Sequence, residues 1–347
     1  MTLISDELPP AEALPARLER VASVSFGALH RFAHVPNEVA FALAVRRRLF
    51  VLPEVSFVIA HGDVPAVLAA KPFRRARNVP FGFVTHGDMR ERPPGAFDAR
   101  LGALYRWAES RSARSADLVI ALGPVMADYA RRRGASDAQI AIVPNGVDLR
   151  DIGISDDDAR TFDGHPLSLV FAGRLAVEKG VNDLLEAMRI LAESRIEVRL
   201  TIAGSGPLAD SLRASASTFP NVTFAGAVPR RQLGGLYRSA DLVIAPSISE
   251  ALPMVILEAL AAGTPVVACP AGDIPFVVRD GENGLLVPPR NPRALANAIA
   301  SLAHDRARLR ALAANARPSV LPAFSWETIG ELLREAIRVR LKERSAE

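Results

Sequence analysis

One octapeptide occurs twice in this chain, and it constrains the fold more than any other feature. Residues 114–121 and 238–245 both read Arg-Ser-Ala-Asp-Leu-Val-Ile-Ala. Chance identity over eight positions is improbable even in a chain rich in Ala and Arg. The repeat therefore indicates two related halves, or else convergent use of one good helix-to-strand junction. Each copy joins a helical pattern to an apolar run of strand type, and a helix-like segment follows it. We therefore expect two similarly built, Rossmann-like halves.

Length and composition agree with two globular domains. The chain has 347 residues, of which 49% are apolar, and domains usually hold about 150 residues. The single Cys269 excludes an intramolecular disulfide and any site with several Cys ligands, which favours a reducing compartment. No apolar run approaches the roughly 20 residues that span a bilayer, and the N-terminal residues lack a signal-peptide pattern. We predict a cytoplasmic protein.

Short apolar runs alternate with longer amphipathic segments along the chain, which is typical of βα units with parallel sheets. The strands expected in the first half are 21–25, 56–60, 80–85, 117–121 and 140–143. Those expected in the second half are 167–172, 198–203, 222–224, 241–245, 265–268 and 285–287. Helical patterns lie near 36–50, 97–114, 124–133 and after residue 181. The predicted fold class is α/β.

The boundary between the halves is expected at an acidic segment. Residues 149–166 are polar and poor in large apolar side chains, which favours a linker between domains 1–148 and 167–322. The last part of the chain, from residue 326, has an amphipathic helical pattern of its own. We assign residues 323–347 to a C-terminal helix.

The strongest functional signal lies where the strand 167–172 ends. It runs into Gly173 and Arg174, and Lys179 then precedes Gly180 and an amphipathic helix. A strand, a loop and a helix N-terminus place backbone N–H groups and the positive end of the helix dipole where an anion binds. Arginine suits bidentate phosphate contact and lysine adds a compact charge, so these residues predict a diphosphate site.

Two ordinary surface cations on a βα loop are the alternative interpretation. Composition argues against it, because Lys71, Lys179 and Lys342 are the only lysines among 42 basic residues. A lysine in this loop therefore indicates that an ammonium group is specifically required.

Two carboxylates follow the second copy of the octapeptide. Glu250 lies in the predicted loop after that copy, and Glu258 comes eight residues later. If the segment between them is helical, they are about two turns apart and face one cleft at the carboxyl edge of the sheet. Carboxylates accept hydrogen bonds from vicinal hydroxyls, which predicts a ribose and a hexose as ligands. A solvated helix face is the alternative.

Three weaker signals follow other predicted strands. Gly204 and Gly206 admit either a nucleobase close to the backbone or a plain turn. His86 ends the strand 80–85 and would point into the cleft between the domains, and a merely hydrogen-bonded His is the alternative. The segment 145–148, Asn-Gly-Val-Asp, predicts a turn with a structural role.

Taken together, residues 56–335 resemble the retaining glycosyltransferases of the GT-B fold, specifically family four. The matching motifs of the second half are Gly173-Arg174, Glu178-Lys179-Gly180, Pro246-Ser247, Glu250, Glu258, Gly263-Thr264-Pro265 and 283–287. The looser motifs of the first half are Val84-Thr85-His86, 115–121 and 144–148. The resemblance implies two Rossmann-like domains that face a central cleft, with a last helix that crosses back onto the first domain.

The resemblance also implies roles for the matching residues. The catalytic residues it implies are Arg174, Lys179, Glu250 and His86. The donor-binding residues it implies are Gly173, Gly204, Gly206, Ala251, Leu252, Pro253 and Glu258. In such an enzyme the cations neutralise the diphosphate of a nucleoside diphosphate sugar, which is a co-substrate. Transfer takes place on the front face, and neither a metal, a cofactor nor a nucleophilic carboxylate is needed.

The chain departs from the family pattern in two places. The family loop Gly-Gly-x-Pro-Glu reads Gly-Asp-Ile-Pro-Phe at 272–276, so Phe276 removes any polar contact of that Glu. Family members open with a strand, a Gly-Gly loop and a helix, whereas residues 1–5 resemble the tail of the next strand. We therefore expect a βα unit of roughly 30 to 40 residues to be missing, through a misassigned start or a truncation. A genuine loss would leave the cleft without a wall.

The leading hypothesis is a retaining, metal-independent glycosyltransferase that acts on a glycan, a lipid-linked or a small-molecule acceptor. The alternatives are a non-catalytic nucleotide-sugar-binding subunit or remnant, and another GT-B enzyme, namely a sugar phosphorylase or a nucleotide-sugar epimerase.

Positive charge concentrates in the first half, where residues 1–150 carry 20 basic and 15 acidic side chains. Basic clusters lie at 46–48 and 71–77. We expect no nucleic-acid partner, because aromatic side chains are not interleaved with these clusters and no nucleic-acid motif is present. A polybasic face predicts peripheral contact with an anionic membrane at its inner face. A solvated charged surface is the alternative.

Overall fold

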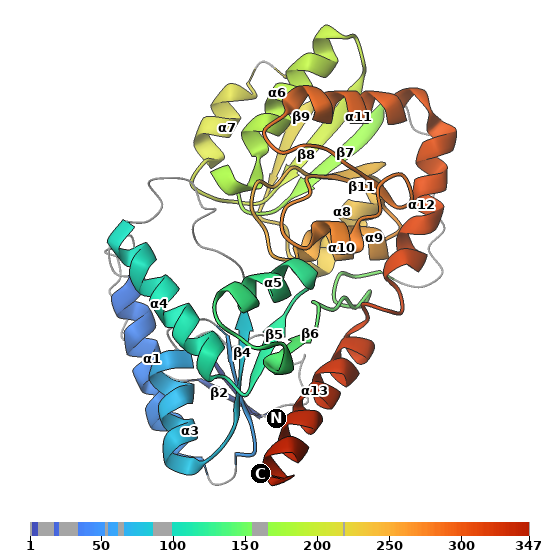
Figure 1. Cartoon of the computed structure of the whole chain (residues 1–347). Coiled ribbons are helices and arrows are strands. Elements are labelled where there is room, and N and C mark those ends of the chain that lie inside the picture. Colours follow the sequence, from blue (N-terminus) through green and yellow to red (C-terminus); the bar gives the residue numbers. More distant parts are fainter. Residues whose placement is uncertain are drawn as a thin grey trace.

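The computed structural model describes residues 2–5, 17–20, 34–52, 55–61, 66–85, 99–154, 166–217 and 219–346 as two α/β domains (Figure 1). The elements of the first domain are β1 (Thr2–Ser5), β2 (Arg17–Arg20), α1 (His34–Val51), β3 (Val58–His61), the π-helical η3 (Ala66–Ala70), α3 (Lys71–Arg77), β4 (Phe81–Thr85), α4 (Ala99–Ser115), β5 (Leu118–Ala121), α5 (Pro124–Arg132), η5 (Asp137–Gln139) and β6 (Ile140–Ile142). Those that follow are β7 (Leu167–Ala172), η6 (Val177–Lys179), α6 (Val181–Glu193), β8 (Val198–Ala203), α7 (Ala209–Ser215), β9 (Val222–Gly226), α8 (Arg230–Ser239), β10 (Leu242–Ala245), α9 (Met254–Ala261), β11 (Val266–Ala268), α10 (Ile274–Val277), β12 (Gly284–Leu286), α11 (Pro292–His304), α12 (Arg306–Val320) and α13 (Trp326–Ala346).

Each domain is built on a parallel sheet. The first sheet has the order β3-β4-β5-β6, and the second has the order β12-β11-β10-β7-β8-β9. Strands β1 and β2 pair in a separate parallel sheet. The order of the second sheet reverses between β7 and β10, and open α/β folds bind ligands at the carboxyl ends of strands at such a switch point. The predicted α/β class with two parallel sheets is confirmed.

The expected strands agree closely with the observed ones. The ranges 167–172 and 198–203 coincide with β7 and β8, and the other expected strands that lie on described residues differ at their ends by one or two residues. Strand β2 was not among the expected strands. The predicted strand 21–25 lies outside the described residues. In the part of the chain that the structure describes, no helix is long and apolar enough to cross a membrane.

Two chain crossings lie side by side where the domains meet. The Val147 N–H donates a hydrogen bond to the Phe324 carbonyl at 2.8 Å, and Val147 forms an isolated parallel bridge with Ser325. Gly146 is required here, because a Cβ would lie 2.6 Å from the ring of Trp326. The crossings therefore form one small paired unit between the domains.

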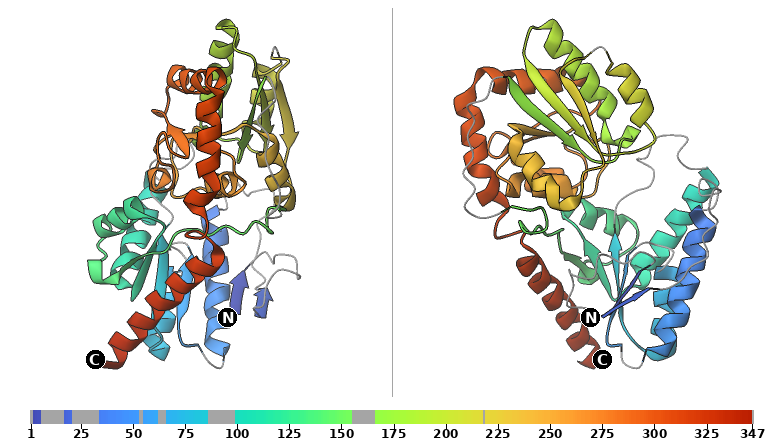
Figure 2. Two further views of the ribbon diagram at one scale, coloured as in Figure 1. Left: turned by 90° about the vertical axis from the view of Figure 1, so that its right-hand side faces the viewer. Right: turned by 180° about the vertical axis from the view of Figure 1, so that it is seen from behind.

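Helix α13 leaves the second domain and runs along the first, as both rotated views show (Figure 2). Its apolar face packs on the first sheet. The residues in this contact are Val84, Leu118, Ile120 and Val143 from the sheet side and Ile329, Leu333, Ala336 and Ile337 from the helix. The predicted return of the last helix to the first domain is confirmed.

The beginning of the expected linker packs against the second domain. Ile152 and Ile154 are 0% and 5% exposed and belong to the same core cluster as Tyr237. The Gly234 N–H donates to the Ile152 carbonyl at 2.8 Å, which fixes this segment to α8. The polar composition of 149–166 as a whole hides these two isolated isoleucines. Residues 155–165 lie outside the described ranges.

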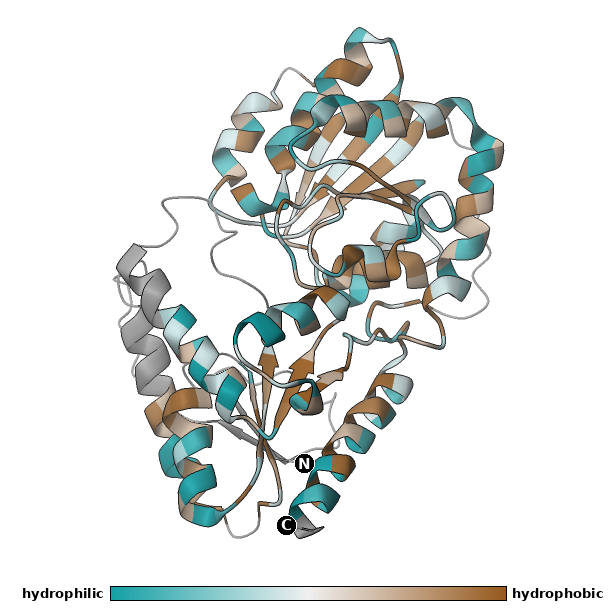
Figure 3. Ribbon diagram, viewed as in Figure 1, coloured by the Kyte–Doolittle hydropathy of each residue, from teal (hydrophilic) through white to brown (hydrophobic). Residues whose placement is uncertain are grey.

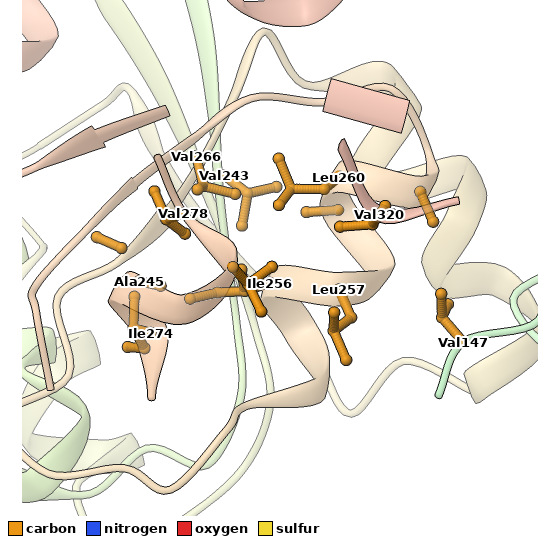
Figure 4. Packing of buried hydrophobic residues seen from close by; sticks show 14 of the residues in the cluster. Val147, Val243, Ala245, Ile256, Leu257, Leu260, Val266, Ile274, Val278 and Val320 are labelled. Carbon is orange, nitrogen blue, oxygen red and sulfur yellow. The ribbon is translucent and has the colours of Figure 1, made fainter. Parts of the chain in front are cut away.

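The core of the second domain supports the carboxyl edge of its sheet. Figure 4 shows Val243, Ile256, Leu260 and Val266 packed together from β10, α9 and β11, with Val147 of the crossing at the periphery. Figure 3 shows the strands as hydrophobic and the outer faces of the helices as hydrophilic. Burial of these apolar side chains makes the edge a rigid base for the loops that follow β7 and β10.

Candidate active site

The loops after β7 and β10 lie against each other at the switch point. Gly180 has a φ of 67°, and a Cβ there would overlap the carbonyl oxygen of Pro246. The Ile248 N–H donates to the Glu178 carbonyl at 2.8 Å. A glycine is therefore needed between η6 and α6 for two reasons, its left-handed backbone and the close approach of the second loop.

Lys179 and Glu250 meet between these two loops. The Lys179 ammonium donates a hydrogen bond to Glu250 Oε1 in an ion pair. The Ser247 hydroxyl donates to the same carboxylate oxygen at 2.9 Å. The side chains of Lys179 and Glu250 are 25% and 11% exposed, so the pair is mostly buried but still reaches the surface. The structure thus joins two predicted site residues that are 71 positions apart.

Arg174 and Gly173 leave open space beside this pair. The Arg174 side chain is 60% exposed, and its Nη1 lies 3.6 Å from Glu178 Oε1, beyond hydrogen-bond length. A Cβ at Gly173 would have only the Phe171 ring nearby, at 3.7 Å, so the space beside this residue is open. Its φ of 156° nevertheless favours glycine, because side chains with a Cβ rarely adopt that backbone conformation. The guanidinium and the open glycine backbone are both available to a ligand.

Gly204 and Gly206 have a structural explanation. A Cβ at Gly204 would overlap the Gly173 carbonyl oxygen, and one at Gly206 would overlap that of Leu175. The Leu175 N–H donates to the Ser205 carbonyl at 2.8 Å, which holds the two loops together. Their direct approach to a nucleobase stays a prediction, whereas their contact with the loop after β7 is observed.

Glu258 lies deeper than Glu250. The intervening segment is helical only from Met254, so the condition of one continuous helix between the two carboxylates is not met. Glu258 is 3% exposed. Its Oε2 accepts a hydrogen bond from the Tyr237 hydroxyl at 3.0 Å, and its Oε1 lies 3.2 Å from Arg230 Nη2. Burial raises the pKa of the Glu258 carboxyl, and Arg230 opposes that shift.

The segment from Ala251 to Pro253 is held from two sides. The Asn145 side-chain amide donates to the Leu252 carbonyl at 2.8 Å, and the Asp273 N–H donates to the Ala251 carbonyl at 2.7 Å. Pro253 is the N-cap residue of α9. Asn145 belongs to the first domain, so this contact connects the domain crossing directly to the loop that carries Glu250.

The departure at 272–276 creates a second contact between the domains. The Asp273 carboxylate accepts hydrogen bonds from the backbone N–H groups of Val125 at 2.7 Å and Met126 at 3.1 Å, in the first turn of α5. Phe276 packs edge-to-face on Phe324, with ring centroids 5.9 Å apart. The Asp therefore caps a helix of the other domain, and the Phe contacts the crossing.

The remaining predicted site residue, His86, lies outside the described residues. The sequence did not reveal that Ser247 and Asn145 form hydrogen bonds within and to the loop that carries Glu250. Nor did it reveal Arg230 and Tyr237 as partners of Glu258. Tyr237 directly precedes the second octapeptide, which was a usable signal. In the described ranges no three His, Cys, Asp or Glu side chains are grouped to hold a metal ion, and metal independence stays a prediction.

Two facing α/β domains, each with a parallel sheet, and a candidate site at the switch point of the second sheet define the class as a GT-B protein. Solved structures of other proteins share this fold. The sucrose-phosphate synthase of Thermosynechococcus elongatus has a TM-score of 0.75 at 24% identity, over 93% of this chain and 84% of that one. Anabaena HepE in complex with UDP and glucose has a TM-score of 0.74 at 22% identity, over 93% and 86%.

Residues 1–151 match the family model described as Glycosyltransferase Family 4, and residues 155–319 match Glycosyl transferases group 1. A D-inositol 3-phosphate glycosyltransferase of Xylanimonas cellulosilytica is 33% identical over 301 residues, which are 82% of this chain and 68% of that one. The chain belongs to glycosyltransferase family 4. It spans about half the length of two other curated relatives, 45% and 55%.

Proposed function

We propose that the protein transfers a sugar, with retention, from a nucleoside diphosphate sugar to an acceptor hydroxyl. The observation that carries this proposal is the Lys179 ammonium held by Glu250 where the loops after β7 and β10 meet. An ammonium has three N–H donors, so one stays on Glu250 while the others bind phosphate oxygens. Preorganised positive charge of this kind stabilises the diphosphate as it leaves.

Arg174 is the second cation of the proposed diphosphate site. Its exposed guanidinium has no hydrogen bond to Glu178 at 3.6 Å, so reorientation toward a phosphate breaks little. Gly173 allows the donor to approach the backbone beside it. The two cations then share the negative charge that develops on the leaving diphosphate.

In this proposal the two glutamates bind the two ends of the donor, Glu258 the nucleoside and Glu250 the sugar. Both carboxylate oxygens of Glu258 have protein partners in this structure. The half-exposed Arg230 side chain therefore moves aside before Glu258 accepts hydrogen bonds from the ribose hydroxyls. Glu250, with the backbone of Ala251 to Pro253, orients the transferred sugar. His86 approaches that sugar from the first domain, and the leaving phosphate helps to deprotonate the acceptor. The HepE complex makes UDP-glucose the first donor to test.

The acceptor is a glycan, a lipid-linked molecule or a small molecule in this proposal, and the first domain makes a peripheral contact with an anionic membrane. Part of the basic cluster at 71–77 is used inside the fold. Arg74 forms two hydrogen bonds of 2.7 Å with Asp117, and Arg77 donates to the Phe50 carbonyl at 3.0 Å. Arg46, Arg47 and Arg75 remain exposed and support the contact.

The test combines calorimetry with UDP- and GDP-sugars and a product assay with an acceptor mixture. Binding together with acceptor-dependent transfer is expected. Binding without any transfer would identify a non-catalytic nucleotide-sugar-binding protein. Demand for inorganic phosphate would identify a phosphorylase, and product formation without acceptor would identify an epimerase.

A further inference from the structure

A strongly basic pocket lies on the first domain, at the C-terminal ends of α4 and α5. Its volume is about 340 Å³. The residues that line it are Arg106, Trp107, Ser110, Arg111, Arg114 and Arg133. Four arginines and one indole thus surround a space that none of the proposed donor-binding residues reaches. Of these six residues only Arg114 was singled out in the sequence, as the first residue of the repeated octapeptide.

Most of the positive charge in this pocket has no neutralising partner. Arg133 pairs with the buried Glu109 at 3.1 Å. Arg106, Arg111 and Arg114 form no ion pair with any described residue. Arg111 and Arg114 are three positions apart on one helix, where like charges repel. The pocket therefore has a surplus of positive charge that an anionic ligand would neutralise.

The positive field extends onto the neighbouring helix α3. The pKa of Lys71 is lowered by burial and then by the charges of Arg111, Arg75 and Arg74. The segment η3, which leads into α3, also contacts α1 and α4, so these helices form one layer on the first sheet. Figure 3 colours much of α3 and of the C-terminal part of α4 as hydrophilic. The basic pocket is thus one part of a larger basic surface.

Helix dipoles explain only part of this arrangement. Cations near a helix C-terminus interact favourably with its carbonyl end, which accounts for Arg114 near the end of α4 and Arg133 at the end of α5. The same argument does not reach Arg106, which is two turns before the end of α4. It does not explain Trp107 either, which is 57% exposed and lies beside the arginines.

Exposed apolar side chains accompany the charge on this helical layer. Among the side chains of this layer that the structure describes, Leu43 and Val51 on α1 are also large, apolar and exposed, at 43% and 65%. A Trp beside arginines is typical of a membrane–water interface, where the indole lies among the headgroups and the cations bind phosphates. A site for a small soluble anion requires neither the exposed indole nor the aliphatic side chains.

The pocket is placed so that its ligand leaves the donor site free. The first turn of α5 contacts Asp273 of the second domain, whereas Arg133 is at the opposite end of this nine-residue helix. At 1.5 Å per residue the two ends are about 13 Å apart. A surface bound at the pocket therefore does not compete with Lys179 or Glu250.

We propose that this arginine pocket binds the phosphate groups of anionic phospholipids and thereby docks the first domain on a membrane surface. The inference rests on the proposed function in one respect, because the docked enzyme would meet its acceptor there. The arginines bind headgroup phosphates through paired N–H donors, and Trp107 enters the interface beside them.

The test is flotation of the full chain with two kinds of vesicle, pure phosphatidylcholine and equal parts of phosphatidylcholine and phosphatidylglycerol. We expect binding only to the second kind, weakened by added salt. The double variant Arg106→Gln with Arg111→Gln is expected to bind about 30-fold more weakly, since each basic residue near an anionic surface contributes roughly fivefold. Trp107→Ala, which keeps every charge, is expected to bind several-fold more weakly.

The matched control is Arg308→Gln with Arg310→Gln, which removes the same charge from exposed positions on α12 and is expected to bind like the parent. Pocket variants that float like the parent would overturn the proposal. Parent protein that ignores anionic vesicles but binds inorganic phosphate at the pocket in calorimetry would assign it to a free anion instead. Altered oligomeric state of the pocket variants, with unchanged flotation, would assign it to a second copy of the chain.

Donor binding and transfer to a soluble acceptor are measured on the same variants and are expected to be unchanged. Lys179→Ala is expected to float normally and to lose transfer. The pocket variants therefore test vesicle binding, and Lys179→Ala tests sugar transfer. Either result can contradict its own proposal without affecting the other.

Discussion

The two copies of the octapeptide, 114–121 and 238–245, have the same sequence and the same role in their sheets, yet different structures follow them. Strands β5 and β10 are completely buried in both copies. The carboxylate of Asp117 accepts a hydrogen bond from the Phe81 N–H at 3.0 Å, and that of Asp241 accepts one from Ser168 at 2.7 Å. In each copy the Asp thus fixes the start of the neighbouring strand.

Beyond the last Ala the copies diverge. After β5 the chain enters α5 within three residues, and the first turn of this helix docks on Asp273 of the second domain. After β10 an eight-residue loop, 246–253, carries Glu250 toward Lys179 before α9 begins. One buried strand therefore supports a domain contact in one half and a candidate active site in the other. Function resides in the loops, which the buried strands hold in place.

The largest expected effect is on the loop pair of the second copy. Lys179→Ala removes the ammonium at the switch point and is expected to lower turnover about 100-fold or more. The control is Lys342→Ala on α13, which removes the same side chain away from both loops. The measurement is steady-state transfer kinetics, with circular dichroism to check the fold. Turnover near that of the parent would exclude a catalytic role for Lys179.

The equivalent carboxylates of the two copies are expected to differ in their effect on stability. Asp117 forms two 2.7 Å hydrogen bonds with Arg74, whereas Arg306 lies 4.0 Å from Asp241. We expect Asp117→Ala to lower the free energy of unfolding by about 2 kcal/mol and Asp241→Ala by about 1 kcal/mol. Urea unfolding measures both. Equal losses would show that the strand-fixing hydrogen bond dominates and that the arginine adds little.

The domain contact of the first copy is expected to depend on pH. Burial raises the pKa of the Asp273 carboxyl, so the folded protein binds this proton more tightly than the unfolded chain. The contribution of Asp273 to stability therefore falls as pH rises from the ordinary value of 3.8 through the raised pKa, and it is constant above that. Asp273→Asn lacks this step.

The measurement is the difference in unfolding free energy between the parent and Asp273→Asn across the acid range. It is expected to decrease with rising pH. A difference that increases with pH would reverse the sign of the inferred shift. At neutral pH, Asp273→Ala, which removes the helix cap altogether, is expected to cost about 1 kcal/mol.

The smallest effect is expected for Glu178→Gln. Its carboxylate lies 3.6 Å from a mostly exposed Arg174, a pair that contributes little to stability. The free energy of unfolding is expected to change by less than about 0.5 kcal/mol. A larger loss would indicate that this pair helps to hold the loop after β7, and Arg174→Gln would then show a similar loss.

Much of the fold was predictable because its signals are local. Strands β7 and β8 were placed correctly from their own apolar runs, and the return of α13 followed from the family resemblance. The glycines and cations of the loop after β7 predicted a ligand site there, which stays a prediction. The linker was harder, since two buried isoleucines, Ile152 and Ile154, lie in a segment that is polar on average.

The sequence by itself determined the α/β class, the two halves and the residue types of the proposed donor site, because apolar runs and loop residues can be identified within short segments. Only the tertiary structure decided which side chains meet. Lys179 reaches Glu250 across 71 positions, and Asp273 reaches α5 across 147 to 148. The arginine pocket joins α4 to the end of α5. Such contacts depend on how loops and domains pack, so no pattern within a short segment predicts them.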